Sequence, residues 1–185
     1  MRRSSKRARA CACPGAWDGF ELAIRAVLGQ QITVVAAARL AGRMVAAFGE
    51  PLPSPSEGLT HVFPRPQIIA AADLASLGMP RSRAAALSAI AAAAVADPHV
   101  FDANCGLDDA VKRLRAIRGV GEWTAQYIAL RQLREPDAFP AADLGLLRAI
   151  AGRDGRKHSS SELLDRANAW RPWRAYAAEH LWAAA

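Results

Sequence analysis

The stretch Leu114-Arg-Ala-Ile-Arg-Gly-Val-Gly-Glu-Trp-Thr-Ala-Gln-Tyr127 is the most informative part of this sequence. An amphipathic helical pattern breaks at Ile117, and a second helix is expected from about Glu122, after a turn that contains Gly119 and Gly121. Two glycines allow a sharp turn and leave the amide groups at the start of the second helix uncovered. Uncovered amides and the helix dipole bind phosphate without reading a base sequence. An ordinary turn between two packed helices would show the same pattern.

The composition favours helices on both sides of this turn. The 185 residues are the length of one ordinary domain, and 52% of them are hydrophobic, which is enough to form a core. Alanine is abundant and aromatic residues make up only 6%, a mixture that is typical of helices and unfavourable for sheets. Alternation of the kind found in strands is absent. We therefore expect an all-α fold.

Caps and helical periodicity locate the expected helices. They cover residues 17–28, 33–48, 68–77, 81–96, a segment from 107, 122–133, a segment from about 143, 161–170 and 172–184. In the second helix, the apolar stripe comprises Val34, Ala38, Ala41, Val45 and Phe48. The stretch 49–66 contains five prolines and is expected to be a loop or an extended connection.

The basic charge is concentrated at the N-terminus. The formal net charge is +7, but five of the 24 basic residues lie in the first ten positions, so that 19 remain against 17 acids. We expect residues 1–16 to be a basic, flexible tail. The longest apolar stretch, 84–96, is too short to cross a bilayer, so no membrane association is expected. Three cysteines cannot form a disulfide framework, which favours a reducing cytoplasm.

Further motifs lie on both sides of the glycine turn. They are Trp17-Asp-Gly-Phe-Glu21, Leu28-Gly-Gln-Gln-Ile-Thr33, Asp137-Ala-Phe-Pro-Ala-Ala-Asp143-Leu144, Trp170-Arg-Pro-Trp-Arg-Ala-Tyr176 and His180-Leu-Trp182. With the glycine turn, they make the chain resemble the DNA-3-methyladenine glycosylase II family, within the helix–hairpin–helix DNA glycosylases. The resemblance implies two small helical layers with a cleft between them over residues 17–185, with the hairpin at about 107–132. It also implies that the N-terminal sheet domain of many bacterial members is lacking here.

The family resemblance implies that Asp143 is the catalytic carboxylate. Taken alone, Asp143 is more typical of an N-cap than of a catalytic residue, since Leu144 begins an apolar helix, and the hairpin some twenty residues upstream favours the catalytic role. The two roles are compatible. In the implied reaction, the glycosidic bond of an alkylated purine breaks, a carboxylate stabilises the resulting oxocarbenium ion, and water completes the hydrolysis.

Aromatic residues are the expected lining of a pocket for the flipped base. Trp123 and Tyr127 lie four residues apart on one helix face, and the resemblance brings Trp182 to the same place. Electron-rich rings suit a cationic base, although each ring is equally compatible with a core position. Relatives that cleave the strand carry a lysine nucleophile where this chain has Trp123, so we expect a monofunctional enzyme without lyase activity.

The expected DNA contacts come from two turns. Gly119, Gly121 and Thr124 of the hairpin are predicted to hold the backbone, and the Gln30-Gln31 turn is predicted to enter the minor groove, with Gln31 as the wedge. No cofactor is expected. Three cysteines cannot supply a four-thiolate cluster, and the only metal considered is a monovalent cation at the hairpin carbonyls.

The sequence thus predicts a monomeric, cytoplasmic and nucleoid-associated base-excision repair enzyme that acts on alkylated bases in double-stranded DNA. Two alternatives remain: a non-catalytic DNA-binding module, or a truncated and inactive glycosylase. A glycosylase specific for mispaired adenine is a further possibility, but it requires cluster cysteines and a second acidic catalyst that the sequence does not supply.

Overall fold

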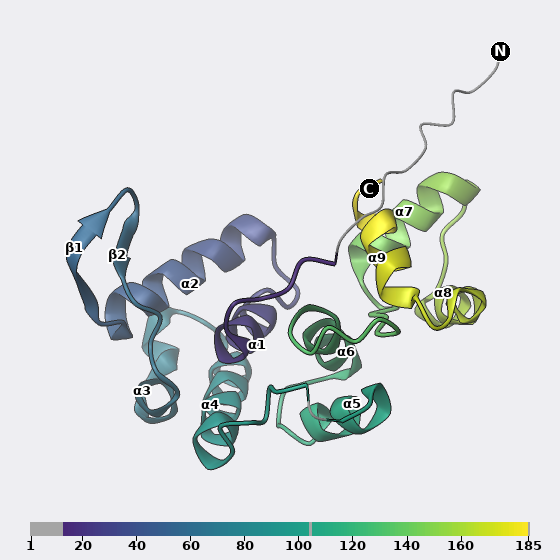
Figure 1. Ribbon diagram of the computed structural model, residues 1–185. Helices are drawn as coiled ribbons and strands as arrows, with labels where there is room; N and C mark the ends of the chain where they lie inside the picture. The colour runs from purple at the N-terminus through teal and green to yellow at the C-terminus, as the bar shows by residue number, and fades with distance from the viewer. Residues whose placement is uncertain (1–12, 104, 185) are drawn as a thin grey trace.

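The computed structural model describes residues 13–103 and 105–184, and it is mostly helical (Figure 1). Its elements are α1 (Gly19–Leu28), α2 (Val34–Phe48), β1 (Pro51–Ser56), β2 (Leu59–His61), α3 (Pro66–Ala71), the 3-10 helix η1 (Leu74–Leu77), α4 (Arg81–Ala96), α5 (Leu107–Arg115), α6 (Glu122–Arg131), α7 (Leu144–Asp154), α8 (Ser160–Ala167), the 3-10 helix η2 (Asn168–Trp170) and α9 (Arg174–Trp182).

Side-chain caps fix the start of several helices where the sequence predicted them. Asp18 accepts a hydrogen bond from the amide of Glu21 at the start of α1, and Thr33 accepts one from Ala36 at the start of α2. The predicted helix 68–77 is wrong as a single element. The chain leaves the helical region at Ala72, whose ψ is 145°, and the Asp73 carboxylate then begins the separate turn η1.

The expected absence of strands was also wrong. Strands β1 and β2 form an antiparallel hairpin, in which Pro51 pairs with His61 and Ser56 pairs with Leu59. The prolines at every second position of β1 have no N–H to donate, and their nitrogens face the same edge of the strand. The opposite edge therefore keeps its N–H groups and can pair with β2. The hairpin is almost entirely exposed and contributes nothing to the buried core. The core is therefore helical, as expected.

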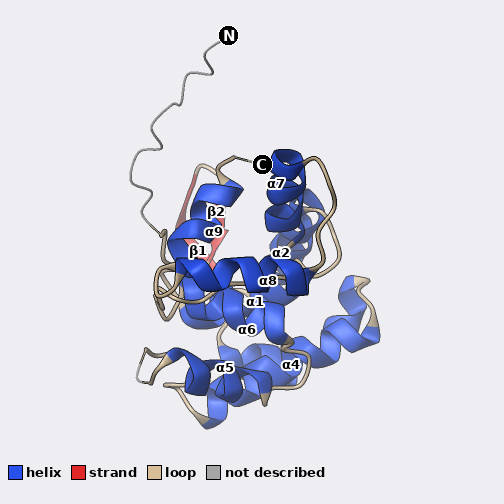
Figure 2. Cartoon of the chain, turned by 90° about the vertical axis from the view of Figure 1, so that its right-hand side faces the viewer, coloured by secondary structure: helices blue, strands red, loops and turns tan. Residues whose placement is uncertain are grey.

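The buried core has two parts, which meet at α6. Helices α1, α3, α4, α5 and α6 enclose the first part, whose largest fully buried side chains include Ile24, Leu87, Ile90, Leu114 and Ile128. Helix α7 packs on α9, and α8 runs into η2, to form the second part. Figure 1 shows α6 between the two groups, and Figure 2 shows α7, α8 and α9 on one side of the molecule with α4 and α5 on the other.

The first half of α2 lies outside this core. Leu40, Ala41 and Met44 are its buried residues, whereas Val34 is 85% exposed and Ala38 is also exposed, contrary to the predicted stripe. Helix α2 packs on α1 and η1, and the first three residues of α2 are exposed.

The described end of the expected tail is attached to α6. The amide of Ala16 donates a hydrogen bond to the carbonyl of Arg131 over 3.0 Å, and the Arg131 guanidinium donates to the carbonyl of Pro14 over 3.2 Å. Residues 1–12 of the expected tail lie outside the described residues. Among the helices of the described ranges, none has both the length and the apolar character needed to cross a membrane.

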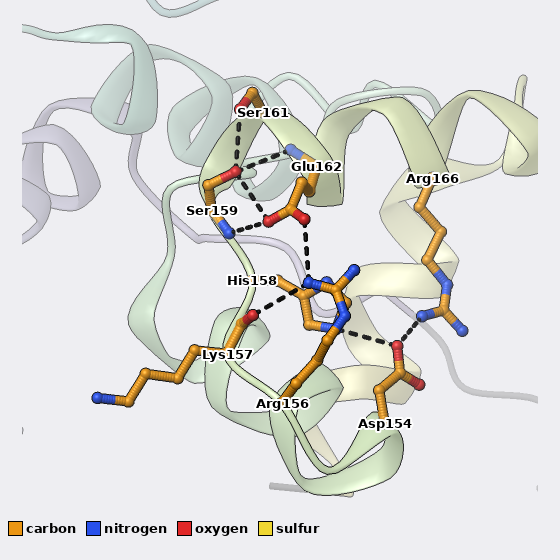
Figure 3. Close-up of polar contacts among 8 residues, drawn as sticks. All are labelled: Asp154, Arg156, Lys157, His158, Ser159, Ser161, Glu162 and Arg166. Atoms are coloured by element: carbon orange, nitrogen blue, oxygen red, sulfur yellow. Dashed lines mark hydrogen bonds and ion pairs between the residues drawn. The ribbon is translucent and has the colours of Figure 1, made fainter.

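Charged side chains fix the connection between α7 and α8 (Figure 3). Ser159 and Glu162 form a reciprocal capping box, and Arg156 donates a hydrogen bond to Glu162 over 3.0 Å. The backbone amide of Ser159 and the Arg156 guanidinium lower the pKa of Glu162 to about 2. Asp154 at the end of α7 pairs with Arg166 of α8, so both ends of the connection are tied together.

Candidate active site

Asp143 lies at the N-terminus of α7 and accepts three hydrogen bonds. Its Oδ1 accepts from the amide of Leu146 over 3.0 Å and from the indole nitrogen of Trp182 over 2.8 Å, and its Oδ2 accepts from the indole nitrogen of Trp123 over 3.0 Å. Asp143 therefore caps α7, and the same carboxylate is held between indoles from α6 and α9. These contacts fix the direction of the side chain.

The charge of Asp143 is not balanced by a cation within the described part of the chain. All three of its donors are neutral. Asp137, only six residues earlier, lies 2.8 Å from Arg174 Nε and 2.9 Å from Arg171 Nε, so its charge is neutralised by two guanidinium groups. The two aspartates of the same motif thus have different partners: Asp137 joins the loop before α7 to α9 through ion pairs, whereas Asp143 is held by neutral donors.

Gly145 makes the contact between Trp182 and Asp143 possible. A Cβ at this position would lie 2.9 Å from Asp143 Oδ1 and 3.1 Å from Trp182 Cδ1. Both distances are shorter than ordinary van der Waals contact, so any side chain here would push the carboxylate and the indole apart.

The three aromatic residues predicted for the base pocket lie together. The rings of Trp123 and Tyr127 stack with their centroids 5.3 Å apart, and Trp182 meets Tyr127 edge-on at 6.4 Å. The guanidinium of Arg131 lies 5.8 Å from the Tyr127 ring centre. Trp123 and Arg131 come from one turn before and one turn after Tyr127, so both are neighbours of its ring on the same helix face. Tyr127 therefore stacks on Trp123, and the rings of Trp123 and Trp182 are both half-buried.

Sequence reasoning missed the ion pair behind these rings. Arg131 Nη1 lies 2.7 Å from Glu179 Oε1, and the two side chains are 18% and 9% exposed. The Arg131 guanidinium also lies 5.0 Å from the ring centre of Trp182. Burial raises the pKa of Glu179, and Arg131 opposes that rise. The spacing of Arg131 four residues after Tyr127 was the one available signal, and nothing in the sequence marked Glu179 as its partner.

The turn between α5 and α6, which is the hairpin predicted from the glycine motif, has the geometry expected of an anion site. Gly119 has a φ of +86°, and a Cβ there would lie 2.2 Å from the Cβ of Ala86 on α4, so this position requires glycine. Gly121 precedes α6 and provides no side-chain cap, and a Cβ there would point into open space. The first amides of α6 are therefore open to an external acceptor.

The structure gives the two glutamines of the α1–α2 turn different surroundings. Gln30 points inward, and its Nε2 donates a hydrogen bond to Thr124 Oγ1 over 2.9 Å. Thr124 is 1% exposed, so its hydroxyl binds Gln30 rather than the solvent. Gln31 is exposed and has a φ of +57°. Of the predicted DNA-contacting side chains, only that of Gln31 faces outward.

A family model described as the HhH-GPD superfamily base excision DNA repair protein matches residues 24–175, which include the hairpin, Asp143 and most of the core. The chain belongs to this superfamily. The superfamily assignment confirms the family resemblance that the sequence motifs indicated. It also agrees with the predicted helical fold.

Among the relatives of this HhH-GPD chain, the DNA-3-methyladenine glycosylase 2 of Escherichia coli is 37% identical over 91% of the chain and 58% of its own length. The probable bifunctional transcriptional activator/DNA repair enzyme AlkA of Mycobacterium tuberculosis is 43% identical over 91% of the chain and 34% of its own length. The solved 3-methyladenine DNA-glycosylase of Archaeoglobus fulgidus superposes with a TM-score of 0.77, at 26% identity over 91% of the chain and 59% of its own. The chain thus spans between about a third and three fifths of these relatives.

Proposed function

We propose that this protein is a monofunctional DNA glycosylase that removes alkylated purines of the 3-methyladenine type from double-stranded DNA. The main support for this proposal is the environment of the Asp143 carboxylate. It has no cationic partner in the described part of the chain, and the indole N–H groups of Trp123 and Trp182 hold it. The names of the relatives from E. coli and A. fulgidus support the same substrate class.

The charge of Asp143 suits the chemistry of this reaction. A base alkylated at N3 is already cationic, so it leaves without strong acid catalysis, and positive charge develops on the sugar. A fixed carboxylate beside the sugar stabilises that charge as the bond breaks. Neutral indole donors orient the carboxylate without cancelling its charge, and water then adds to the sugar to give an abasic site.

The rings around Asp143 support the proposed preference for cationic bases. A flipped base that reaches Asp143 passes the half-buried rings of Trp123 and Trp182, whose π-faces attract positive charge. Lyase chemistry needs an amine nucleophile at this place, and the indole of Trp123 cannot form a Schiff base.

The hairpin and the α1–α2 turn provide the proposed DNA contacts. A backbone phosphate accepts hydrogen bonds from the open amides that follow Gly121, and the exposed Gln31 fills the space that the flipped base leaves. Both contacts and the carboxylate come from one chain, which supports action as a monomer.

The direct test is base release from a defined duplex. We expect abasic sites in DNA that carries 3-methyladenine or hypoxanthine, with no strand cleavage and no borohydride-trapped protein–DNA adduct. A trapped adduct would show a lyase. Tight duplex binding without any abasic product from either substrate would instead support a non-catalytic DNA-binding module.

A further inference from the structure

The turn that carries Gln31 is held in an unfavourable backbone conformation. Gln31 is not glycine, yet its φ of +57° lies in the left-handed region. Such a conformation persists only where surrounding contacts determine it. The side chain of Gln31 is exposed, so the restraint comes from neighbouring residues.

Gln30 supplies that restraint through contacts distant in sequence. Its side-chain nitrogen donates to Thr124 Oγ1 on α6 over 2.9 Å and approaches the carbonyl of Gly119 at 3.4 Å. Its own backbone carbonyl accepts a hydrogen bond from Arg83 of α4 over 2.6 Å. One residue therefore joins the α1–α2 turn to the hairpin, to the start of α6 and to α4.

We infer that Gln30 is a positioning residue that fixes the Gln31 turn against the phosphate-binding hairpin. This inference rests on the proposed function, in which Gln31 enters the duplex while the hairpin holds a phosphate. Because the Gln30–Thr124 hydrogen bond joins the two turns, the wedge sits at a set distance from the phosphate before DNA arrives. Preorganisation of this kind removes the entropic cost of ordering the turn on binding. Gln30 acts on DNA through Gln31 and reads no base itself.

The first test needs no DNA. Hydrogen–deuterium exchange of residues 29–33 is measured in the wild type, Gln30→Ala and Thr124→Val, with Thr124→Ser as the matched control that keeps the hydroxyl. Loss of one hydrogen bond of ordinary strength is expected to speed exchange in this segment about three- to tenfold. Thr124→Ser should exchange like the wild type. Unchanged exchange in both Gln30→Ala and Thr124→Val would overturn the inference.

The second test asks whether Gln30 works through Gln31. Base flipping is followed by the fluorescence of 2-aminopurine next to hypoxanthine in a duplex, for each single variant and for Gln30→Ala combined with Gln31→Ala. We expect Gln30→Ala to weaken flipping in the wild-type background and to have no further effect once Gln31 is alanine. Full additivity would show that Gln30 contacts DNA itself and would overturn the inference. A wild type that flips the base but gives no abasic product from either the hypoxanthine or the 3-methyladenine duplex would overturn the glycosylase proposal and leave this inference standing.

Discussion

Replacing Gly145 with alanine perturbs the proposed catalytic contact directly. Ordinary contact begins at 3.4 Å, and the new Cβ would lie 2.9 Å from Asp143 Oδ1, an overlap of about 0.5 Å. It would also lie 3.2 Å from Trp182 Nε1, so the 2.8 Å hydrogen bond between indole and carboxylate must lengthen or bend. Asp143 cannot move away freely, because Leu146 and Trp123 hold it on two further sides.

The expected loss follows from this displacement. A hydrogen bond to a charged group contributes about 1.5–3 kcal/mol, and loss of that amount in the transition state lowers the rate roughly 10- to 150-fold. Overpacking costs about 1–3 kcal/mol, against which alanine regains roughly 0.5–1 kcal/mol over glycine within a helix. We therefore expect a modest fall in Tm together with a large fall in the single-turnover rate of base release.

Gly152→Ala is the matched control, because it lies in the same helix α7 and its Cβ would meet no atom within 4 Å. This variant should keep the wild-type rate and show a slightly higher Tm. A Gly145→Ala protein that releases base at the wild-type rate would refute the claim that the Trp182–Asp143 contact supports catalysis.

Three further predictions concern the α5–α6 turn, the Arg131–Glu179 ion pair and the connection between α7 and α8. Gly119→Ala should lower the free energy of unfolding by roughly 2–4 kcal/mol through left-handed strain and overpacking, and should therefore lower Tm strongly. Gly121→Val, whose side chain would point into open space, should largely preserve Tm and weaken duplex binding in a salt titration. Equal Tm losses in the two variants would contradict this. Arg131→Met alone should lower Tm by more than Arg131→Met combined with Glu179→Gln, because the single substitution leaves the buried Glu179 carboxylate unpaired. A double variant less stable than the single one would disprove this role of the ion pair. The pKa of Glu162 falls from 4.5 to about 2 on folding, so its contribution to stability is complete above pH 4.5 and is lost as the pH falls towards 2. The Tm difference between the wild type and Glu162→Gln should shrink over that range in calorimetric scans, and a constant difference would refute the assignment.

The sequence predicted those features that depend on local patterns. Asp143 followed by apolar residues predicted the cap of α7, and the glycine spacing predicted the turn before α6. The grouping of Trp123, Tyr127 and Trp182 needed the family resemblance as well, since Trp182 lies more than fifty residues beyond the other two.

The remaining contacts join residues that no local pattern connects. Gln30 meets Thr124 across 94 positions, and only the packing of α1 on α6 brings them together. The β1–β2 hairpin was missed because proline, which has no N–H to donate, is unfavourable in most strands. The hairpin still forms because the edge of β1 on which the proline nitrogens lie is not paired with another strand. Periodicity also failed for Val34, since an apolar residue on a helix is buried only where another element covers it.

In the proposed reaction, the charge of Asp143 stabilises the sugar cation. Asp143→Asn keeps an oxygen for the Leu146 amide and the Trp182 indole and removes the charge. Its NH2 group replaces the oxygen that accepts from the Trp123 indole, so that one hydrogen bond is lost and a modest fall in Tm is expected. The measurement is the single-turnover rate of 3-methyladenine release from a saturated duplex, with bound DNA confirmed for both proteins. We predict a fall of roughly 10²- to 10³-fold, as for removal of one electrostatic stabiliser elsewhere. Equal rates for wild type and Asp143→Asn would show that the charge of Asp143 does not stabilise the sugar cation.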